Sequence, residues 1–477
     1  MSLKIFLRDA LINALGLEPT ACQVKMFDRL AEFISDKEYE DGIMLINGYA
    51  GTGKTSAISA LVRLLKEHEQ KYVLMAPTGR SAKVLSGYTG HSSYTVHKQI
   101  YRQKSLKDGI GSFVLDINRN KDTIFIVDEA SLISSGTNET ALFGSGNLLD
   151  DLVKYVRMSS GNRLILIGDS AQLPPVGEEI SNALNPEYLK RYGEVMYVQL
   201  KSVVRQVQNS GILYNATLLR QMIENYTGTA FPNFEIEKFS DIERIRGDEL
   251  IEKITGSFDK YSADETIILC RSNKRANRYN QGIRSKILYR EERINRGDKL
   301  MVVKNCYQFS DQVEEIEFIA NGDIAELIKI SNYEERYGLN FAKAILSFPD
   351  YGNLELEARI ILDTLESESA SLNAEQQKAL FEGVMEDYAH IKQKRKRVAA
   401  VREDAYYNAL QIKYAHAITC HKSQGGQWKA VFIDNPFWKE SVTKDDLKWL
   451  YTALTRATNK IYFINFGDNY FITKHKY

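Results

Sequence analysis

The sequence has no excess of charge of either sign, because 62 lysine and arginine residues balance 62 aspartate and glutamate residues. This balance excludes a positive field over the whole chain, so any binding track for a polyanion must be local. Long apolar runs are also missing, and no stretch approaches the length of a membrane span. Residues 1–10 are mixed in charge and lack the apolar core of a signal peptide. We therefore expect no association with a membrane.

Cysteine is scarce as well. The four cysteines (Cys22, Cys270, Cys306 and Cys420) lie far apart in the sequence and form no C-x-x-C pair. This spacing supports neither a disulfide framework nor a zinc site. We expect a cytoplasmic enzyme with free thiols.

The remaining composition is ordinary for a soluble globular protein, with 44% hydrophobic and 26% charged residues. At 477 residues the chain is too long for a single hydrophobic core. Its length predicts about three or four domains of ordinary size.

The most specific stretch of the sequence covers residues 43–56. An apolar run that is typical of a buried strand leads into Gly48-x-x-x-x-Gly53-Lys54-Thr55, and the apolar spacing of a helix follows. This pattern between a strand and a helix predicts a phosphate-binding P-loop.

Phosphate binding requires these residue types. Glycines let the backbone curl so that successive N–H groups converge on phosphate oxygens, and the start of the helix adds partial positive charge. We expect Lys54 to reach the β- and γ-phosphates and the Thr55 hydroxyl to ligate Mg²⁺. The predicted nucleotide-binding residues of the loop are Gly48, Gly51, Thr52, Gly53, Lys54, Thr55 and Ser56.

Three further apolar strands are predicted in the first half of the chain, at residues 72–76, 123–127 and 163–168. Polar side chains follow each of them, including Asp128 and Glu129 after the second strand and Gln172 beyond the third. Strands alternating with helices predict an open α/β sheet whose loops gather at the carboxyl ends of its strands. In a P-loop protein, Asp128 in this position fits a role in orienting Mg²⁺ and Glu129 a role in activating water. The alternative is an ordinary helix start, where acidic residues are common.

The second half of the chain repeats the strand and helix pattern, with apolar strands at residues 266–270 and 430–433, so we expect a second α/β domain. Short β-rich pieces between residues 297 and 330 predict a small β-barrel inserted into it. Residues 361–407 form a charged, largely helical stretch. In the first half, the polar segment 101–122 contains two glycines and predicts a hairpin.

Taken together, these motifs resemble those of superfamily 1 DNA helicases, in the branch that contains RecD-type enzymes and the phage Dda helicase. The resemblance covers nearly the whole chain and rests on G-Y-A-G-T-G-K-T, D-E-A-S, G-D-S-A-Q-L-P-P-V-G, H-K-S-Q-G and Y-T-A-L-T-R-A in the family's order. It implies an α/β fold of two RecA-like P-loop domains with parallel sheets. A small β-hairpin excursion is implied in the first domain, and an SH3-like β insert plus a helical segment in the second.

The resemblance also implies domain boundaries. The first RecA-like domain is expected at residues 1–93 and 122–197, the hairpin excursion at 94–121, the second RecA-like domain at 198–290 and 411–477, and the insert at 291–410.

Roles in the nucleotide site follow from the same resemblance. Gln23 resembles the glutamine that reads adenine, and Gln172 the residue that senses the γ-phosphate. Arg205 and Arg456 resemble the two arginines that reach across the cleft, where a planar guanidinium offsets charge on the transferring phosphoryl group. The implied catalytic residues are Lys54, Asp128, Glu129, Gln172, Arg205 and Arg456. ATP and Mg²⁺ are the expected cofactors, with Thr55 and Asp128 as metal ligands and Gly425 as a further nucleotide contact.

The residues expected to bind DNA lie in both domains. They are Thr78, Ser81, Lys83, Thr95, His97, Asn273, Thr419, His421, Lys422 and Ser423. Hydroxyls and cations favour phosphate contacts without base readout, as a translocase indifferent to sequence requires. The excursion falls where the family carries a strand-separating hairpin, and this branch moves 5′ to 3′.

The expected partners are single-stranded and forked DNA, together with single-strand-binding, replication or recombination proteins. The resemblance implies a monomeric helicase in the cytoplasm of a bacterium or a phage-infected cell.

Three other functions stay open at this stage. A single-strand translocase that displaces proteins without strong unwinding would not need the hairpin. An RNA helicase of the same superfamily would be stimulated by RNA as well as by DNA. A P-loop kinase is disfavoured, because Arg205 and Arg456 belong to a second domain with motifs of its own.

Overall fold

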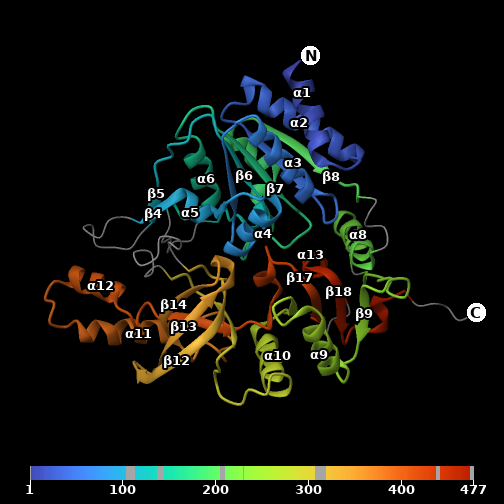
Figure 1. Ribbon diagram of the computed structural model, residues 1–477. Coiled ribbons are helices and arrows are strands. Elements are labelled where there is room, and N and C mark those ends of the chain that lie inside the picture. Colours follow the sequence, from blue (N-terminus) through green and yellow to red (C-terminus); the bar gives the residue numbers. More distant parts are fainter. Residues whose placement is uncertain are drawn as a thin grey trace, which may run out of the picture.

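The computed structural model describes residues 2–103, 113–136, 144–204, 210–228, 230–306, 319–436 and 441–472. Within these residues the strands form two parallel sheets, a closed barrel and a short hairpin. The first sheet and its helices occupy the upper half of Figure 1, and the second sheet and the barrel lie beside each other in the lower half. The two expected RecA-like α/β domains and the inserted barrel are therefore confirmed.

The first sheet has six parallel strands in the order β3-β2-β6-β7-β1-β8. Their bounds are β1 Ile43–Gly48, β2 Tyr72–Ala76, β3 Ser93–Thr95, β6 Ile124–Val127, β7 Arg163–Gly168 and β8 Val195–Leu200. The central strands β1, β6 and β7 are almost entirely buried, as expected for a parallel sheet covered on both faces. Because every pair is parallel, the loops that follow these strands meet at one edge of the sheet.

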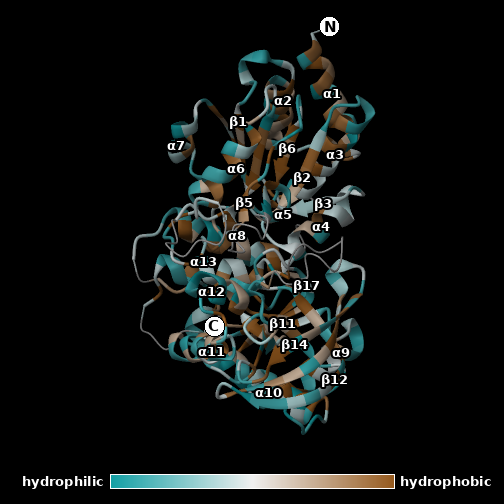
Figure 2. Cartoon of the chain, turned by 90° about the vertical axis from the view of Figure 1, so that its left-hand side faces the viewer, coloured by the Kyte–Doolittle hydropathy of each residue, from teal (hydrophilic) through white to brown (hydrophobic). Residues whose placement is uncertain are grey.

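Helices cover both faces of this sheet. The helices are α1 Leu3–Leu15, α2 Ala21–Ser35, α3 Lys54–Glu67, α4 Gly79–Thr89, α5 Val96–Ile100, α6 Leu148–Val156 and α7 Pro186–Leu189. Apolar residues of α1 to α4 pack against one face, and those of α5 to α7 against the other. The strands of this sheet are largely hydrophobic, as Figure 2 shows. Burial of both faces by helices supplies the main stabilising term of this domain.

The base of the expected hairpin is present. Strands β4 Tyr101–Gln103 and β5 Phe113–Leu115 pair antiparallel, and residues 104–112 between them lie outside the described residues. The segment before the hairpin belongs to the main domain, because β3 pairs with β2 and Val96 and Ile100 are fully buried in the core. Only the part from Tyr101 onward is therefore an excursion from the sheet.

The second sheet has five parallel strands in the order β16-β10-β17-β18-β9. The strands are β9 Ile242–Ile245, β10 Thr266–Cys270, β16 Ala417–Thr419, β17 Trp428–Asp434 and β18 Ala457–Ile464, and the helices around them are α8 Gly211–Glu224, α9 Leu250–Tyr261, α10 Asn273–Lys286 and α13 Lys444–Leu454. Its main core extends into the first domain through Tyr49, Ala171 and Leu173. The two α/β domains therefore share apolar contacts at their junction.

The barrel is closed by five strands, β11 Lys299–Val302, β12 Ile324–Arg336, β13 Leu339–Phe348, β14 Leu354–Ile361 and β15 Leu410–Tyr414. Strand β15 pairs with β11 and β14, so the barrel continues to Tyr414, beyond the boundary at residue 411 expected from the sequence. The helices α11 Ala374–Asp387 and α12 Lys394–Glu403 account for the predicted helical stretch. They lie at the lower left of Figure 1 and are largely hydrophilic in Figure 2.

All four cysteines are free thiols, and three of them are buried. Among the helices that the structure describes, none combines the length and the apolar character needed to cross a membrane.

His416, between β15 and β16, gives the fold a pH dependence. The residue is 4% exposed, its ring packs on Phe258, and neither ring nitrogen has a hydrogen-bond partner among the described residues. Burial, with a smaller contribution from nearby cations such as Lys299, lowers the pKa of His416 to about 3. Below pH 6.5 the His416 imidazole is protonated in the unfolded chain but stays neutral in the folded chain. The free energy of unfolding therefore decreases as the pH falls.

We expect His416→Phe to remove this loss. Between pH 7 and pH 4.5 the wild type should lose about 2–3 kcal/mol more of its free energy of unfolding than the variant, because the charged imidazole is excluded only from the folded state. Urea unfolding at both pH values measures the difference. The exposed His390 provides a matched control, since His390→Phe should follow the wild type. An identical pH dependence of wild type and His416→Phe would contradict the assignment.

Candidate functional site

The loop after β1 has a backbone that only glycine accommodates well. Gly51 and Gly53 adopt φ angles of +72° and +80°, in the left-handed region. A Cβ atom on Gly53 would lie 2.5 Å from Nε2 of Gln23, and one on Gly48 would lie 2.8 Å from Cγ of Lys54. The loop therefore has the close backbone curl that a phosphate cradle requires.

Lys54 is the first residue of α3, and its ammonium lies over this loop. It donates hydrogen bonds to the carbonyl oxygens of Gly48 and Tyr49, and it lies 3.9 Å from Oδ2 of Asp169. Neutral carbonyl oxygens are weaker partners for an ammonium than an anion is. When phosphate binds, the Lys54 ammonium would therefore favour hydrogen bonds to the phosphate oxygens over those to the carbonyl oxygens.

Gln23 lies against the P-loop, although it precedes it in the sequence. It is buried in the first turn of α2, where Oε1 accepts a hydrogen bond of 2.9 Å from the backbone N–H of Thr20. Its Nε2 donates to the carbonyl oxygen of Thr52 at 3.4 Å. The capping box of α2 thus holds Gln23 beside the loop, as its predicted contact with adenine requires.

The two acidic residues after β6 are held in different ways. Asp128 accepts hydrogen bonds from the Tyr88 hydroxyl at 2.7 Å and from the backbone N–H of Glu129 at 2.9 Å. Burial and the neighbouring Glu129 carboxylate raise the pKa of Asp128. Glu129 has a φ of +53°, a strained conformation for a residue with a Cβ atom. Strain of this kind clusters at functional sites, which supports a specific task for Glu129.

The donor atoms near the P-loop suit Mg²⁺. The Thr55 hydroxyl and the Asp128 carboxylate are hard oxygen ligands, and a cation would offset the repulsion that raises the pKa of Asp128. Among the described residues, no group of three His, Cys, Asp or Glu side chains could hold a metal by itself. Phosphate oxygens and water would have to complete the coordination, as is usual for Mg²⁺.

Tyr451 of α13 connects the second domain to this site. Its hydroxyl donates to Oδ2 of Asp169 at 2.6 Å and accepts from the backbone N–H of Ala50, in the P-loop, at 2.8 Å. Asp169 follows β7 and is 1% exposed. The Oγ1 of Thr452 accepts a hydrogen bond of 2.9 Å from the backbone N–H of Leu173. One turn of α13 is therefore bonded both to the P-loop and to the loop after β7.

Of the three remaining predicted catalytic residues, the structure describes Gln172 and Arg456. Gln172 is buried, and its Oε1 has no hydrogen-bond partner among the described residues. Arg456 is also buried, and among the described residues it donates hydrogen bonds to the carbonyl oxygens of Thr452 and Gly426 and to the hydroxyl of Thr455, all in the second domain. Arg205 lies outside the described residues. The predicted contact of Arg456 with nucleotide would thus require this side chain to exchange its present partners.

Residues from all three units meet at the start of α4. The Thr78 and Ser81 side chains cap this helix and contact each other at 2.6 Å. A Cβ atom on Gly425 would lie 2.9 Å from Oγ1 of Thr78, so this glycine faces the first domain's predicted DNA-binding loop. Lys83 reaches the barrel, where it lies 3.4 Å from Oδ1 of Asp350.

Arg80 strengthens this junction. Its guanidinium lies over the Trp428 ring at 4.2 Å and donates to the carbonyl oxygen of Gln427 at 3.1 Å. A cation over an aromatic face is attractive, particularly where water is excluded. The predicted DNA-binding segments of the two α/β domains are therefore in direct contact.

The other predicted DNA-binding residues differ in their access to solvent. Thr95 caps α5, and burial lowers the pKa of His97 to about 4, so this histidine is neutral at pH 7. Ser423 is fully buried and donates its hydroxyl to the carbonyl oxygen of Cys420 at 2.7 Å. Lys422 donates to the Asn321 side chain in the barrel. Their contacts with DNA stay predictions.

The last three predicted residues lie near the ends of strands of the second sheet. His421 is exposed, whereas Asn273 and Thr419 are half-buried. Asn273 begins α10 after β10, and Thr419 ends β16. Since β10 and β16 are parallel neighbours, these residues share the carboxyl edge of the second sheet.

Three residues of the site were not predicted from the sequence. Asp169 carried a usable signal, because it follows a buried strand directly, as Asp128 does. Tyr451 lay in a recognised motif, but nothing in its spacing indicates a partner 401 residues away. Tyr88 sits within a helix pattern and gave no signal of its contact with Asp128.

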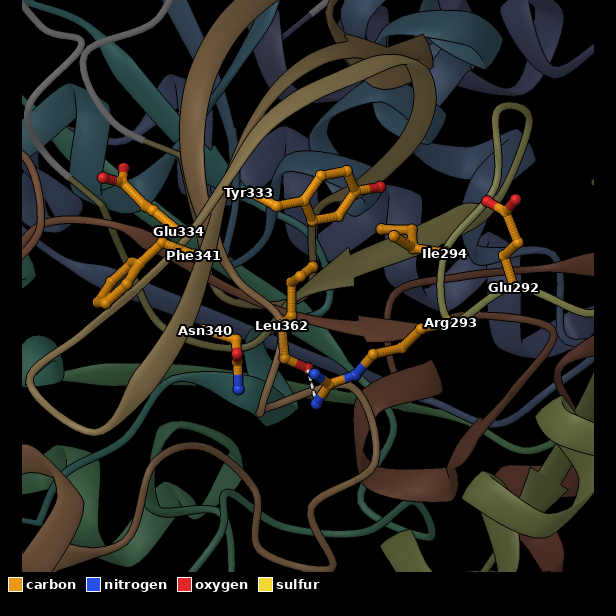
Figure 3. A pocket seen from close by; sticks show the side chains of 8 residues that line it. All are labelled: Glu292, Arg293, Ile294, Tyr333, Glu334, Asn340, Phe341 and Leu362. Atoms are coloured by element: carbon orange, nitrogen blue, oxygen red, sulfur yellow. Dashed lines mark hydrogen bonds between the residues drawn. The ribbon is translucent and has the colours of Figure 1, made fainter.

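A separate cavity of about 320 Å³ lies on the barrel rather than at the P-loop. Its lining residues are labelled in Figure 3: Glu292, Arg293, Ile294, Tyr333, Glu334, Asn340, Phe341 and Leu362. Arg293 points to the carbonyl oxygen of Leu362 and donates to it at 3.2 Å, and Asp363 lies 3.5 Å away. Its cationic group is thus already paired, and the cavity contains no residue of the predicted site.

Comparison with known proteins matches two family models to the chain. An AAA domain matches residues 37–227, and a UvrD-like helicase C-terminal domain matches residues 414–464. The first spans the P-loop and the acidic residues after β6, and the second spans the residues after β15 up to the end of β18.

Individual proteins resemble the chain over nearly its whole length. The ATP-dependent DNA helicase Pif1 of Campylobacter jejuni is 24% identical over 93% of this chain and 93% of its own length. The ATP-dependent DNA helicase dda of Enterobacteria phage T4 is 23% identical over 93% of this chain and 99% of its own length. A crystal structure of a Bacteroides Pif1 helicase in complex with ADP-AlF3 and ssDNA is 15% identical, covers 96% of this chain and 95% of that chain, and has a TM-score of 0.47.

Proposed function

Because the chain belongs to the superfamily 1 helicases of the Pif1, Dda and RecD type, we propose that it is an ATP-dependent DNA helicase that moves 5′ to 3′ along single-stranded DNA and unwinds duplex. The observation that carries the proposal is the bridge made by Tyr451. A residue of the second domain contacts both the P-loop and the buried acid beside Lys54. A nucleotide site connected in this way to a second domain suits a motor better than an isolated kinase.

The residues of the first domain would bind and orient the nucleotide. The P-loop amides and Lys54 would hold phosphate oxygens, Gln23 would contact the adenine, and Glu129 would accept a proton from the attacking water. Mg²⁺, held through Thr55 and Asp128, would neutralise part of the phosphate charge. Water is partly excluded here, which strengthens each of these electrostatic contacts.

Arg205 and Arg456 would act from the second domain. The guanidinium of Arg456 is held by carbonyl and hydroxyl oxygens of its own domain, which are neutral acceptors. A charged phosphate would compete well for it once the cleft closes. Closure would thus complete the catalytic set, and reopening after hydrolysis would reset it.

The DNA track would run across the junction at the start of α4. Thr78, Ser81 and Lys83 face residues of the second domain and the barrel there, so relative motion of the domains would change the grip on a strand. The β4–β5 hairpin is the candidate for separating the two strands. Single-stranded and forked DNA are the proposed substrates, and the chain would act as a monomer inside the cell, with single-strand-binding, replication or recombination proteins as partners.

Stimulation of ATP hydrolysis by nucleic acid tests the proposal. We expect single-stranded DNA to raise the hydrolysis rate strongly and RNA of the same sequence to raise it much less. Equal stimulation by RNA would favour an RNA helicase. No stimulation by either strand would rule out a nucleic-acid motor.

The Tyr451 bridge gives a prediction for ATP affinity. In Tyr451→Phe, the buried Asp169 carboxylate loses a hydrogen-bond donor and attracts the Lys54 ammonium more strongly, in competition with phosphate. A hydrogen bond to a charged group contributes about 1.5–3 kcal/mol, so we expect the KM for ATP to rise about tenfold, with a smaller change in kcat.

Steady-state kinetics with saturating single-stranded DNA measures the change in KM. Tyr197→Phe is the matched control, because Tyr197 is 40% exposed on β8, away from Asp169. An unchanged KM in Tyr451→Phe would show that the bridge has no part in binding ATP.

A further inference from the structure

A cavity of about 240 Å³ lies at the junction of the two α/β domains, beside the residues that follow β7. Asp169, Ser170, Gln172 and Ser181 of the first domain line it, and Lys448 of α13 closes it from the second domain. Pockets for drug-sized ligands measure roughly 300–1,000 Å³, so this cavity suits a smaller molecule or ion.

Lys448 brings a poorly paired positive charge to the cavity. The residue is 8% exposed, and its ammonium has one hydrogen-bond partner among the described residues, the carbonyl oxygen of Glu179 at 3.5 Å. A contact of this length is weak. Burial lowers the pKa of Lys448, although Asp445 offsets part of the effect. A buried cation without a close counter-charge is costly, so Lys448 favours the arrival of an anion.

The first domain contributes unpaired polar atoms to the same cavity. Oε1 of Gln172 and Oγ of Ser181 are both buried and have no hydrogen-bond partner among the described residues. Gln172 is 6% exposed. Buried polar atoms are nearly always hydrogen-bonded in native structures, so two of them beside a buried cation indicate a ligand. An acceptor, a hydroxyl and an ammonium together complement an ion that carries both anionic oxygens and a hydroxyl group.

Asp169 does not prevent an anion from entering. Its Oδ2 accepts from Tyr451, its Oδ1 accepts from the backbone N–H of Ala171 at 3.0 Å, and Lys54 lies 3.9 Å away. The carboxylate therefore has partners for both oxygens and a cation beside it. The same distance to Lys54 shows that the cavity adjoins the phosphate end of the P-loop.

We propose that this cavity binds inorganic phosphate released by hydrolysis, before it leaves the protein. The inference rests on the proposed ATPase function, which supplies the phosphate. The ammonium of Lys448 would contact a P–O⁻ oxygen, and Oε1 of Gln172 would accept from a P–OH group, which both H2PO4⁻ and HPO4²⁻ carry at neutral pH. Lys448 lies one turn before Tyr451 and Thr452, which bond the first domain, so separation of the domains would take the ammonium away from the ion. Phosphate release would thereby be linked to opening of the cleft.

Binding of inorganic phosphate to the nucleotide-free protein tests this site without any need for hydrolysis. A Lys54→Ala background weakens phosphate binding by the P-loop itself, and a ligand that binds the folded state raises the unfolding temperature. We expect phosphate to stabilise Lys54→Ala relative to chloride of equal ionic strength. Lys54→Ala with Lys448→Met should need at least tenfold more phosphate for the same shift.

Two further variants complete the test. Lys444→Met, on the exposed face of the same helix, should leave the phosphate dependence of Lys54→Ala unchanged. Ser181→Ala should weaken phosphate binding several-fold and keeps the site testable if Lys448→Met does not fold. The site is refuted if Lys54→Ala is not stabilised by phosphate, or if Lys448→Met or, in its place, Ser181→Ala leaves the dependence unchanged.

The ATPase reaction provides an independent readout. Added phosphate should inhibit the wild type at a concentration about tenfold lower than it inhibits Lys448→Met, and equal inhibition would overturn the proposal. A chain that binds phosphate through Lys448 but hydrolyses no ATP would contradict the proposed function and leave the site intact.

Discussion

Lys54→Ala should lower the rate of ATP hydrolysis by about a thousandfold or more. The Lys54 ammonium lies over the P-loop, where it donates hydrogen bonds to the carbonyl oxygens of Gly48 and Tyr49. Removing one donor that stabilises developing charge in a site that excludes water costs about 10²–10³ in kcat, and loss of phosphate affinity adds to this. Steady-state ATPase assays with saturating single-stranded DNA measure the loss.

The effect of Lys54→Ala must be separated from a general effect on α3. Lys66, in the last turn of the same helix, is exposed, and Lys66→Ala should retain wild-type hydrolysis. The unfolding temperature of Lys54→Ala should stay close to that of the wild type, because alanine is a good helix former. Hydrolysis within tenfold of the wild-type rate would contradict the role given to Lys54.

Glu129→Gln should slow hydrolysis about 10²- to 10⁴-fold while ATP binding is retained. Glutamine keeps the size of the side chain but cannot accept a proton, and loss of a general base typically costs this much. Burial would still raise the pKa of Asp128, but the smaller contribution from the Glu129 charge would be removed, so a metal-binding role of Asp128 should be retained. Quenched-flow hydrolysis and titration with a fluorescent ATP analogue measure the two effects separately.

A matched control exists for the unusual backbone of Glu129. Glu69 also has a φ of +53°, but it is exposed at the end of α3 and away from the site. Glu69→Gln should therefore behave as the wild type in both assays. If Glu129→Gln turned over ATP normally, the catalytic assignment would be wrong, and if it lost ATP binding the residue would have a structural role instead.

Local patterns in the sequence were sufficient to predict much of the fold. The apolar run before Gly48 and the helical spacing after Lys54 are short-range signals, and they identify the strand, loop and helix of the P-loop. Acidic residues directly after a buried strand predicted the location of Asp128 and Glu129, because parallel strands deliver their loops to one edge of a sheet. The insert was also predicted as a β-barrel from its short β-rich pieces.

Features that depend on distant contacts could not be predicted in this way. Strand β15 alternates apolar and polar residues, as many strands do, and only its pairing with β11 and β14 assigns it to the barrel. The hydroxyl of Tyr451 finds its partners across a domain junction, which no periodicity reveals. The neutral state of His97 results from burial by surrounding elements, and the sequence shows only a histidine able to carry charge.

The position of Arg456 illustrates a further limit of prediction from the sequence. Its motif predicts a contact with nucleotide, whereas its side chain here bonds to Thr452, Thr455 and Gly426 within its own domain. A residue that acts only when two domains close has different partners in different states, and a sequence motif describes one of them. We therefore expect Arg456 to exchange these neutral partners for phosphate when the cleft closes on ATP.

Unwinding of duplexes with a single-stranded tail tests the central claim most directly. Two substrates of identical sequence, one with a 5′ tail and one with a 3′ tail, are compared with ATP and Mg²⁺ present, and strand separation is followed over time. A motor that moves 5′ to 3′ should separate the 5′-tailed duplex and leave the 3′-tailed duplex intact. Separation of the 3′-tailed duplex alone would contradict the polarity, and ATP hydrolysis without separation of either would contradict the helicase.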